Sequence, residues 1–153
     1  MMKFCIALGA LLVGFSASYY FVFALPNIQK QRLTEQTNAA LWQREQECST
    51  RAEHFFNESS WSEKGNTSYE SHFNHRLNRC FISVRSNTFE ATSIFYYKVL
   101  ADVNDVKTIG EYDKQVMHGV ADYTVKPFVC SMLEKYCTTD DEFDAFVKTY
   151  MED

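Results

Sequence analysis

One segment near the start of the chain constrains the fold more than any other feature. It reads FCIALGALLVGFSASYYFVFAL, begins at Phe4, ends at Leu25 and contains no charged side chain. A transmembrane helix needs roughly 20 predominantly apolar residues. The aromatic residues near the end of the segment, followed by Lys30 and Arg32, are typical of a membrane interface. We therefore predict an uncleaved N-terminal membrane anchor within residues 1–26.

A cleaved signal peptide is the alternative interpretation of the same segment. Cleavage after Ala24 would follow a small-x-small-like sequence, and Ser18 offers a second position. The apolar core of a cleaved signal is usually about 7 to 15 residues long, whereas this run stays apolar through Phe23. The anchored form is the prediction, and secretion after cleavage is the alternative.

Four cysteines follow the apolar segment, at Cys48, Cys80, Cys130 and Cys137. An even number of cysteines in a small domain is typical of a disulfide framework in an oxidising compartment. Four reduced thiols buried in a cytosolic domain are the alternative. No pair has the C-x₂₋₄-C spacing that zinc sites normally use. We therefore predict disulfides and, with them, an N-in, C-out topology that places the C-terminal domain in the periplasm.

The positions of these cysteines favour one of their three possible pairings. Cys48 lies near the end of a predicted long helix and Cys80 at the start of the first predicted strand, and the loop region between them is long enough to fold back. Cys130 and Cys137 flank the predicted turn into the last helix. We expect Cys48 to pair with Cys80 and Cys130 with Cys137.

Residues 27–56 contain no proline or glycine and are rich in Gln and Glu. Apolar side chains recur every three to four residues and are densest toward the far end. This pattern predicts one long helix that is packed only at that end. The expected organisation is an anchor or signal peptide at residues 1–26, a helical stalk at 27–47 and a small extracytoplasmic domain at 48–153.

Several short strands are predicted in the middle of the chain. Apolar and polar residues alternate over residues 80–84, a β-rich run covers 92–101, and a third alternation follows at 106–110. The sequences SNT and DVND supply turns between these runs, so neighbouring strands should pair antiparallel, with residues 94–99 central and buried on both faces. A further short strand is expected within residues 125–132.

The chain ends in a predicted helix with a clear start signal. Thr139 and Glu142 form a capping box, and acidic residues crowd the first turn, where they complement the helix dipole. Its apolar stripe comprises Phe143, Phe146, Val147 and Tyr150. The predicted fold class is thus α+β: an N-terminal membrane helix continuing into a stalk helix, a small antiparallel sheet packed against helices, and a C-terminal helix.

Two histidines stand three residues apart in the stretch SYESHFNHRLNRC. Interpreted as a helix from Tyr69 to Cys80, this stretch has a single apolar arc, with His72 and His75 beside it and Arg79 between them. That arrangement offers a cation no carboxylate and too few ligands. The histidines are therefore predicted to face solvent or a loop, and no metal site is predicted.

The sequence contains no dinucleotide-binding, P-loop, G-x-S-x-G, H-E-x-x-H or calcium-loop motif. We therefore predict no catalytic, cofactor-binding or metal-binding residues, and no cofactor. A reduced Cys48 or Cys80 acting as a nucleophile with His54 or His75 would contradict the oxidising compartment. The formal net charge of -5, with no offsetting basic cluster, argues against a nucleic-acid partner.

Three stretches carry a resemblance to known sequences: ECSTRAEHFF, YESHFNHRLNRCFISV and CTTDDEFDAFVKTYME. Between Glu47 and Glu152 they resemble small exported or membrane-anchored bacterial proteins of uncharacterised activity. The resemblance implies an extracytoplasmic location and no particular activity.

These features predict a non-enzymatic binding or accessory module outside the cytoplasmic membrane, with an unknown ligand and a protein partner in the cell envelope. The alternative is a small structural subunit of an integral membrane complex, because Gly9 and Gly14 could support helix packing within the apolar segment. An unrecognised enzyme is the third possibility.

Overall fold

The computed structural model describes residues 19, 20, 22, 25–59, 61, 66–121, 125–133 and 135–153. The predicted membrane segment from Phe4 to Leu25 lies almost entirely outside these residues. Among the residues described, no helix is long and apolar enough to cross a membrane. The chain divides into two compact units, and the boundary between them follows Gln43.

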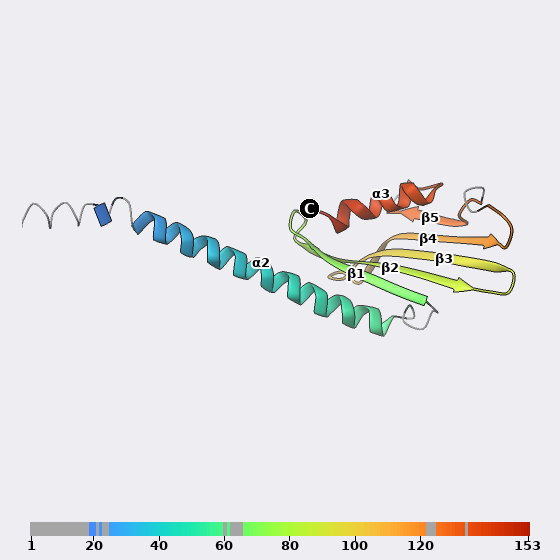
Figure 1. Ribbon diagram of the computed structural model, residues 1–153, viewed down its shortest axis with the longest axis horizontal. Coiled ribbons are helices and arrows are strands. Elements are labelled where there is room, and N and C mark those ends of the chain that lie inside the picture. The colour runs from blue at the N-terminus through green and yellow to red at the C-terminus, as the bar shows by residue number, and fades with distance from the viewer. Residues whose placement is uncertain are drawn as a thin grey trace, which may run out of the picture. The chain divides into compact units, whose positions relative to one another are not determined.

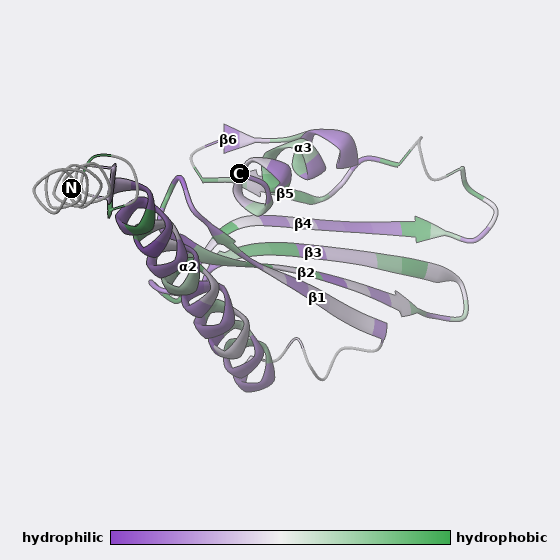
Figure 2. Ribbon diagram, turned by 60° about the vertical axis from the view of Figure 1, so that its left-hand side comes forward, coloured by the Kyte–Doolittle hydropathy of each residue, from purple (hydrophilic) through white to green (hydrophobic). Residues whose placement is uncertain are grey.

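Helix α2 (Leu25–Glu58) confirms the long helix predicted for residues 27–56. Pro26 lies in its first turn, where the missing N–H removes no intrahelical hydrogen bond. Its buried residues, Cys48 and Ala52, are one turn apart and near its C-terminal end, whereas most of the helix is hydrophilic (Figure 2). The prediction that only the far end of this helix is packed is therefore confirmed.

Six strands form one antiparallel sheet in which the spatial order equals the chain order. Each strand pairs with the next, so the sheet is a meander that needs only short connections (Figure 1). The strands are β1 (Asn66–Asn74), β2 (Arg79–Phe89), β3 (Ser93–Asp102), β4 (Lys107–Met117), β5 (Val129–Met132) and β6 (Lys135–Tyr136). Together with α2 and the C-terminal helix α3 (Asp140–Met151), they confirm the α+β fold class.

The helix expected from Tyr69 to Cys80 is wrong, because this stretch forms β1, a turn and the start of β2. Tyr69 and Phe73 are spaced to fit either one face of a helix or one face of a strand. In the structure they pair with Val84 and Cys80 across the antiparallel ladder, and both pack against the buried cluster that includes Cys48. Pairing with β2 decides between the two periods, which the spacing of Tyr69 and Phe73 leaves open.

The turn expected at SNT is also wrong, because β2 continues through residues 86–88 to Phe89. These residues pair with β3, and the reversal comes at residues 90–92, where the Glu90 N–H donates to the Ser93 carbonyl at 2.8 Å. The predicted strand within residues 125–132 is present as β5, and it begins two residues after Pro127.

The turn expected at DVND is confirmed. Asp102 Oδ1 accepts the backbone N–H of Asn104 at 2.9 Å, which is the side-chain geometry that favours Asp before a turn. Arg79 forms ion pairs with both Asp102 and Asp105. The guanidinium thereby ties the start of β2 to the turn between β3 and β4.

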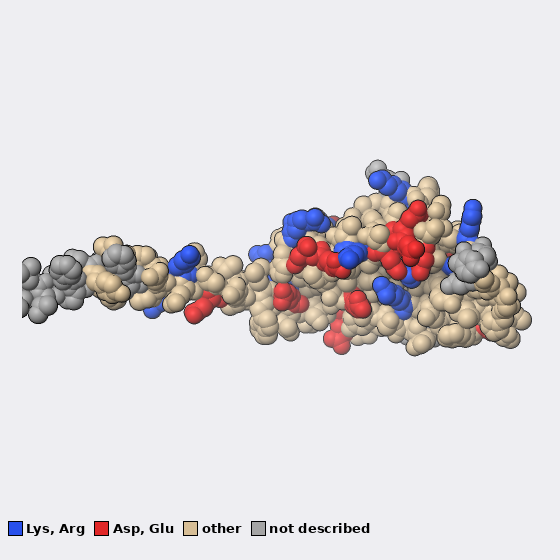
Figure 3. Space-filling model, turned by 45° about the horizontal axis from the view of Figure 1, so that its top comes forward, with Lys and Arg blue, Asp and Glu red and all other residues tan. Residues whose placement is uncertain are grey.

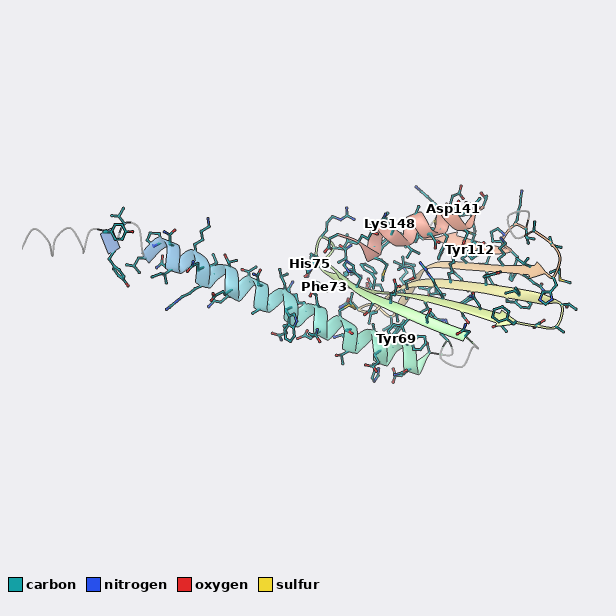
Figure 4. All side chains as sticks on the ribbon, in the orientation of Figure 1. Tyr69, Phe73, His75, Tyr112, Asp141 and Lys148 are labelled. Carbon is teal, nitrogen blue, oxygen red and sulfur yellow. A yellow bond between two sulfur atoms is a disulfide. The ribbon has the colours of Figure 1, made fainter. Side chains whose placement is uncertain are left out.

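The sheet is covered on its two faces by different helices (Figure 1). The C-terminal part of α2 packs on one face, where Cys48 and Ala52 belong to one buried cluster with Ile82, Val84 and Val99. Helix α3 packs on the other face against Phe81, Leu100 and Tyr112, and Figure 4 shows Tyr112 close to this helix. Successive residues along β2, and likewise along β3, thus point alternately into the core beneath α2 and the core beneath α3.

Strand β3 lies inside the sheet, as predicted, but only part of it is buried on both faces. Val99, Leu100 and Ala101 are at most 1% exposed, whereas Ile94 to Lys98 are half-buried. The two helices cover the end of β3 that contains residues 99–101, so the expectation of full burial over residues 94–99 is wrong for most of that range.

Helix α3 begins as its capping box predicts. Thr139 Oγ1 accepts the backbone N–H of Glu142 at 3.2 Å. Glu142 Oε2 accepts the backbone N–H of Thr138 at 2.7 Å, one residue earlier than the cap residue itself. The Thr138 N–H, then the Thr138 hydroxyl and, more weakly, the Thr139 N–H lower the pKa of the Glu142 carboxyl.

Both predicted disulfides are present. Cys48 pairs with Cys80 and fastens α2 to the start of β2, with a Cα separation of 5.4 Å. Cys130 pairs with Cys137 and closes a small ring that contains the β5–β6 hairpin, with a Cα separation of 5.0 Å. All four cysteines are buried.

Candidate functional site

A cleft of about 600 Å³ opens beside β5, between the sheet and helix α3. This volume lies within the range of about 300–1,000 Å³ typical of small-molecule sites. We call it the β5 cleft. Its lining residues come from β4, β5, β6, the intervening turn and α3: Lys107, Thr108, Ile109, Gly110, Ser131, Met132, Leu133, Lys135 and Phe146.

The wall of the β5 cleft is largely apolar. Ile109 is 8% exposed, and Met132 and Phe146 are half-buried members of the core beneath α3. Gly110 allows the helix to approach closely, since a Cβ atom there would lie 2.9 Å from Phe146 Cε1. Replacing this glycine would push the Phe146 ring away from the strand, so Gly110 sets the position of one cleft wall.

Two lysines line the β5 cleft, and both are exposed. Lys107 begins β4 and Lys135 begins β6. Neither forms an ion pair with any other residue in the described part of the chain, unlike Lys98, which pairs with Asp140, and Lys148, which pairs with Glu152. The β5 cleft therefore combines an apolar wall with two available positive charges.

Leu133, in the turn between β5 and β6, has an unusual conformation. Its φ is +52°, a left-handed value that costs a residue with a side chain about 1 kcal/mol or more. Its backbone N–H donates to the Ile109 carbonyl at 2.8 Å, which holds the turn against β4. The side chain is nevertheless 56% exposed, so the turn presents a strained and exposed aliphatic group to the cleft.

A second group of polar side chains lies where α2, the β1–β2 turn and the end of α3 meet. We call Glu45, His72, His75 and Asp153 the junction cluster. His75 Nε2 is 3.2 Å from Glu45 Oε1 and 3.5 Å from Asp153 Oδ2, while His72 Nε2 is 3.5 Å from Asp153 Oδ1. The expectation that no carboxylate faces these histidines is therefore wrong.

The histidines of the junction cluster are also more buried than predicted. The side chains of His72 and His75 are 27% and 32% exposed, and the His75 ring packs edge-on against Phe73 (Figure 4). The Nε2 atom of His72 is buried and has no hydrogen-bond partner among the described residues. Asp153 Oδ1 lies 3.5 Å away from it, at the limit of a hydrogen bond.

Hydrogen bonds around the junction cluster indicate a structural role. The backbone N–H of His75 donates to Asp153 Oδ1 at 2.8 Å, and this bond, with the charges of the two imidazoles, lowers the pKa of Asp153. Asn74 is fully buried, and its Nδ2 donates to the carbonyls of Tyr150 and Glu152, each at 3.1 Å. These contacts satisfy two carbonyls at the C-terminal end of α3 and fasten that end to the β1–β2 turn.

The acids in the first part of α3 have a partner that sequence reasoning missed. Lys98, on the central strand, is only 15% exposed, and its Nζ is 2.5 Å from Asp140 and 3.0 Å from Asp144. Figure 3 shows acidic side chains gathered on one face of the molecule with basic ones around them. The acids therefore fasten the helix to the sheet as well as complementing its dipole.

On the opposite sheet face, Tyr97 of β3 is half-buried. Burial and then the charge of Glu111 raise the pKa of Tyr97 to about 12. The phenol is therefore protonated at neutral pH and poorly suited to act as a base.

The sequence predicted the four half-cystines, and the structure places each of them in a disulfide. It did not predict the β5 cleft, whose lining residues come from distant parts of the chain. Among the described residues, no three His, Cys, Asp or Glu side chains meet in an arrangement that could hold a metal ion. No family profile, curated protein or solved structure matches this chain.

Proposed function

We propose that this protein is a membrane-anchored binding or accessory module of the cell envelope, with its folded domain outside the cytoplasmic membrane. The observation that carries the proposal is the pair of buried disulfides. Such bonds form and persist in oxidising compartments and are rare in the cytosol.

A binding role has further support from the β5 cleft, a concave site of small-molecule size with polar groups at an apolar wall. Anchoring rests on the apolar sequence between Phe4 and Leu25, which ends where α2 begins. The module would thus be held at the membrane by its N-terminal segment and present its ligand site on the folded domain.

Counting free thiols tests location and anchoring together. The chain has five cysteines, of which four are paired, so one thiol, Cys5, remains. We expect full-length protein, denatured directly from cells with a polyethylene-glycol maleimide, to carry one adduct before reduction and five after reduction. None before and four after would show that the N-terminal segment is cleaved. Five before reduction would place the domain in a reducing compartment and refute the proposal.

A topology reporter gives an independent test. A phosphatase that is active only in the periplasm, fused after Asp153, should be active, and the same fusion lacking residues 4–25 should be inactive. An inactive but stable full-length fusion would contradict the proposed orientation.

The alternative, a small subunit of a membrane complex, makes a different prediction. Exchanging residues 4–25 for an unrelated membrane span should leave a tethered binding module functional and disable a subunit that packs through Gly9 and Gly14. Recovery of a partner from native membranes by crosslinking, before and after the exchange, provides the readout.

A further inference from the structure

We propose that the β5 cleft binds a small anionic amphiphile, whose acyl chain lies on Ile109, Met132 and Phe146 and whose head group pairs with Lys107 and Lys135. This inference rests on the proposed binding role and names the chemical class of the ligand.

The apolar half of the ligand follows from the cleft wall. Ile109, Met132 and Phe146 present aliphatic, thioether and aromatic surface, and the exposed Leu133 adds to it. An acyl chain is flexible enough to follow such a wall, and each methylene group that it removes from water favours binding. A purely polar ligand would leave this apolar surface in contact with water.

The anionic half follows from the two lysines. The protein is acidic overall, with a net charge of -5, yet the charged residues that line the described part of the cleft are both lysines. Because neither is neutralised by another described residue, a carboxylate or phosphate would find two partners already in place. A nucleic acid fits poorly, since the net charge of -5 repels a phosphate backbone.

The conformation of Leu133 is a third, independent observation. Residues held in left-handed backbone conformations cluster at ligand sites, where the surrounding structure imposes the strain. Leu133 is held by its hydrogen bond to Ile109 and by the disulfide ring closed between Cys130 and Cys137. A glycine at this position would relieve the backbone strain. The leucine keeps the strain, but its side chain adds apolar surface to the cleft.

Photolabelling of the full-length protein in membrane vesicles tests the proposal. The probe is dodecanoate carrying a diazirine on its chain, and crosslinked residues are mapped by mass spectrometry. We expect label on the cleft wall, and at least threefold less label from the methyl ester of the same probe, which lacks the charge. A dodecyl phosphate probe distinguishes the head groups: labelling by both anions assigns the cleft to anionic heads in general, and labelling by dodecanoate alone assigns it to fatty acids.

Matched variants separate the charge from general effects. The double variant Lys107→Gln/Lys135→Gln should lose about three- to tenfold of the cleft label, as expected for two exposed ion pairs. Lys126→Gln changes an exposed lysine that does not line the cleft, and should label normally. Leu133→Gly should lose label while keeping or raising the thermal midpoint, because glycine accepts the left-handed φ.

The experiments distinguish failure of the ligand assignment from failure of the proposed location. Equal labelling by the ester, label spread over the domain, or full labelling of the double lysine variant would overturn the ligand assignment. Such a result with the expected thiol count would leave the extracytoplasmic location standing. Cleft labelling together with five free thiols would support the ligand and refute the location.

Discussion

Removing the two disulfides one at a time should cost different amounts of stability, because they close loops of very different length. Cys48 and Cys80 are separated by 32 residues and Cys130 and Cys137 by 7. In the chain-entropy treatment, closure of the longer loop stabilises the fold by about 3.7 kcal/mol and closure of the shorter loop by about 2.4 kcal/mol. The predicted difference is about 1.3 kcal/mol in favour of the bond between α2 and β2.

Alanine pairs are suitable replacements, since all four cysteines are at most 7% exposed and each substitution leaves a similar small void. Urea unfolding can be followed by the fluorescence of Trp61. Its ring centroid lies 5.5 Å from that of Phe55, beside the buried cluster between α2 and the sheet, which we call the α2-facing core. Trp42 is 63% exposed and can be replaced by Phe in every variant to remove its signal.

With a urea slope of about 1–3 kcal/mol per molar, Cys48→Ala/Cys80→Ala should unfold about 0.4 to 1.3 M earlier than Cys130→Ala/Cys137→Ala. If the Cys48→Ala/Cys80→Ala variant also loses packing between α2 and the sheet, the difference between the two urea midpoints becomes larger. Equal midpoints, or the opposite order, would refute the assignment of stability to loop closure.

Two further changes probe the hydrogen bonds that fix α3. Asn74→Ala should reduce the free energy of unfolding by about 2 to 3 kcal/mol, because the buried Asn74 side chain makes three hydrogen bonds, each contributing about 1 kcal/mol. Urea midpoints check this, and a loss below about 0.5 kcal/mol would contradict it. The pKa of Glu142 is lower in the folded chain than its usual 4.5, so its contribution is present above pH 4.5 and is lost as the pH falls through the folded value. Glu142→Gln should therefore flatten the decline in stability between about pH 5 and pH 3, and an unchanged acid profile in urea unfolding would count against the capping contact.

Local signals predicted helices α2 and α3 and the disulfides. The polar, proline-free run up to Glu58 and the capping box at Thr139 act within a few residues of the elements that they define. The cysteine pairing followed from the order of these elements, because it required only that a helix fold back onto the first strand.

The β1–β2 hairpin could not be predicted in the same way. Tyr69 and Phe73 satisfy both the helical and the strand period, and their neighbours include two histidines and several small polar residues without a strong preference. The turn places Asn78 at a φ of +53°, a value that asparagine adopts more readily than most residues. Asn78 was the local signal that could have indicated a reversal instead of a helix.

The β5 cleft was out of reach for a different reason. Its two lysines lie 28 positions apart and its aromatic wall comes from α3, so no window of sequence contains the site. A leucine at position 133 gives no indication of a binding site in the sequence. Only its backbone φ of +52°, which the structure shows, indicates one. A site assembled by sheet pairing needs the register of the sheet, which the sequence alone did not supply.

On the proposed function, the short disulfide links the oxidising compartment to the ligand site. Ser131, Met132, Leu133 and Lys135, four of the nine residues that line the cleft, lie inside the ring that Cys130 and Cys137 close. Opening the ring removes the covalent restraint on the strained turn, so the turn can relax and the lysine and leucine can leave their positions. In an oxidising compartment the ring keeps the cleft preorganised.

This connection predicts that the two disulfide variants rank in opposite orders for stability and for binding. Cys130→Ala/Cys137→Ala should lose at least threefold of the dodecanoate label while costing less stability. Cys48→Ala/Cys80→Ala should keep its label at any temperature at which it remains folded, because that bond lies at the α2-facing core and closes no part of the cleft. Photolabelling of both variants, each held well below its own thermal midpoint, measures the contrast. If label falls in proportion to stability in both, the short ring has no separate role in shaping the site.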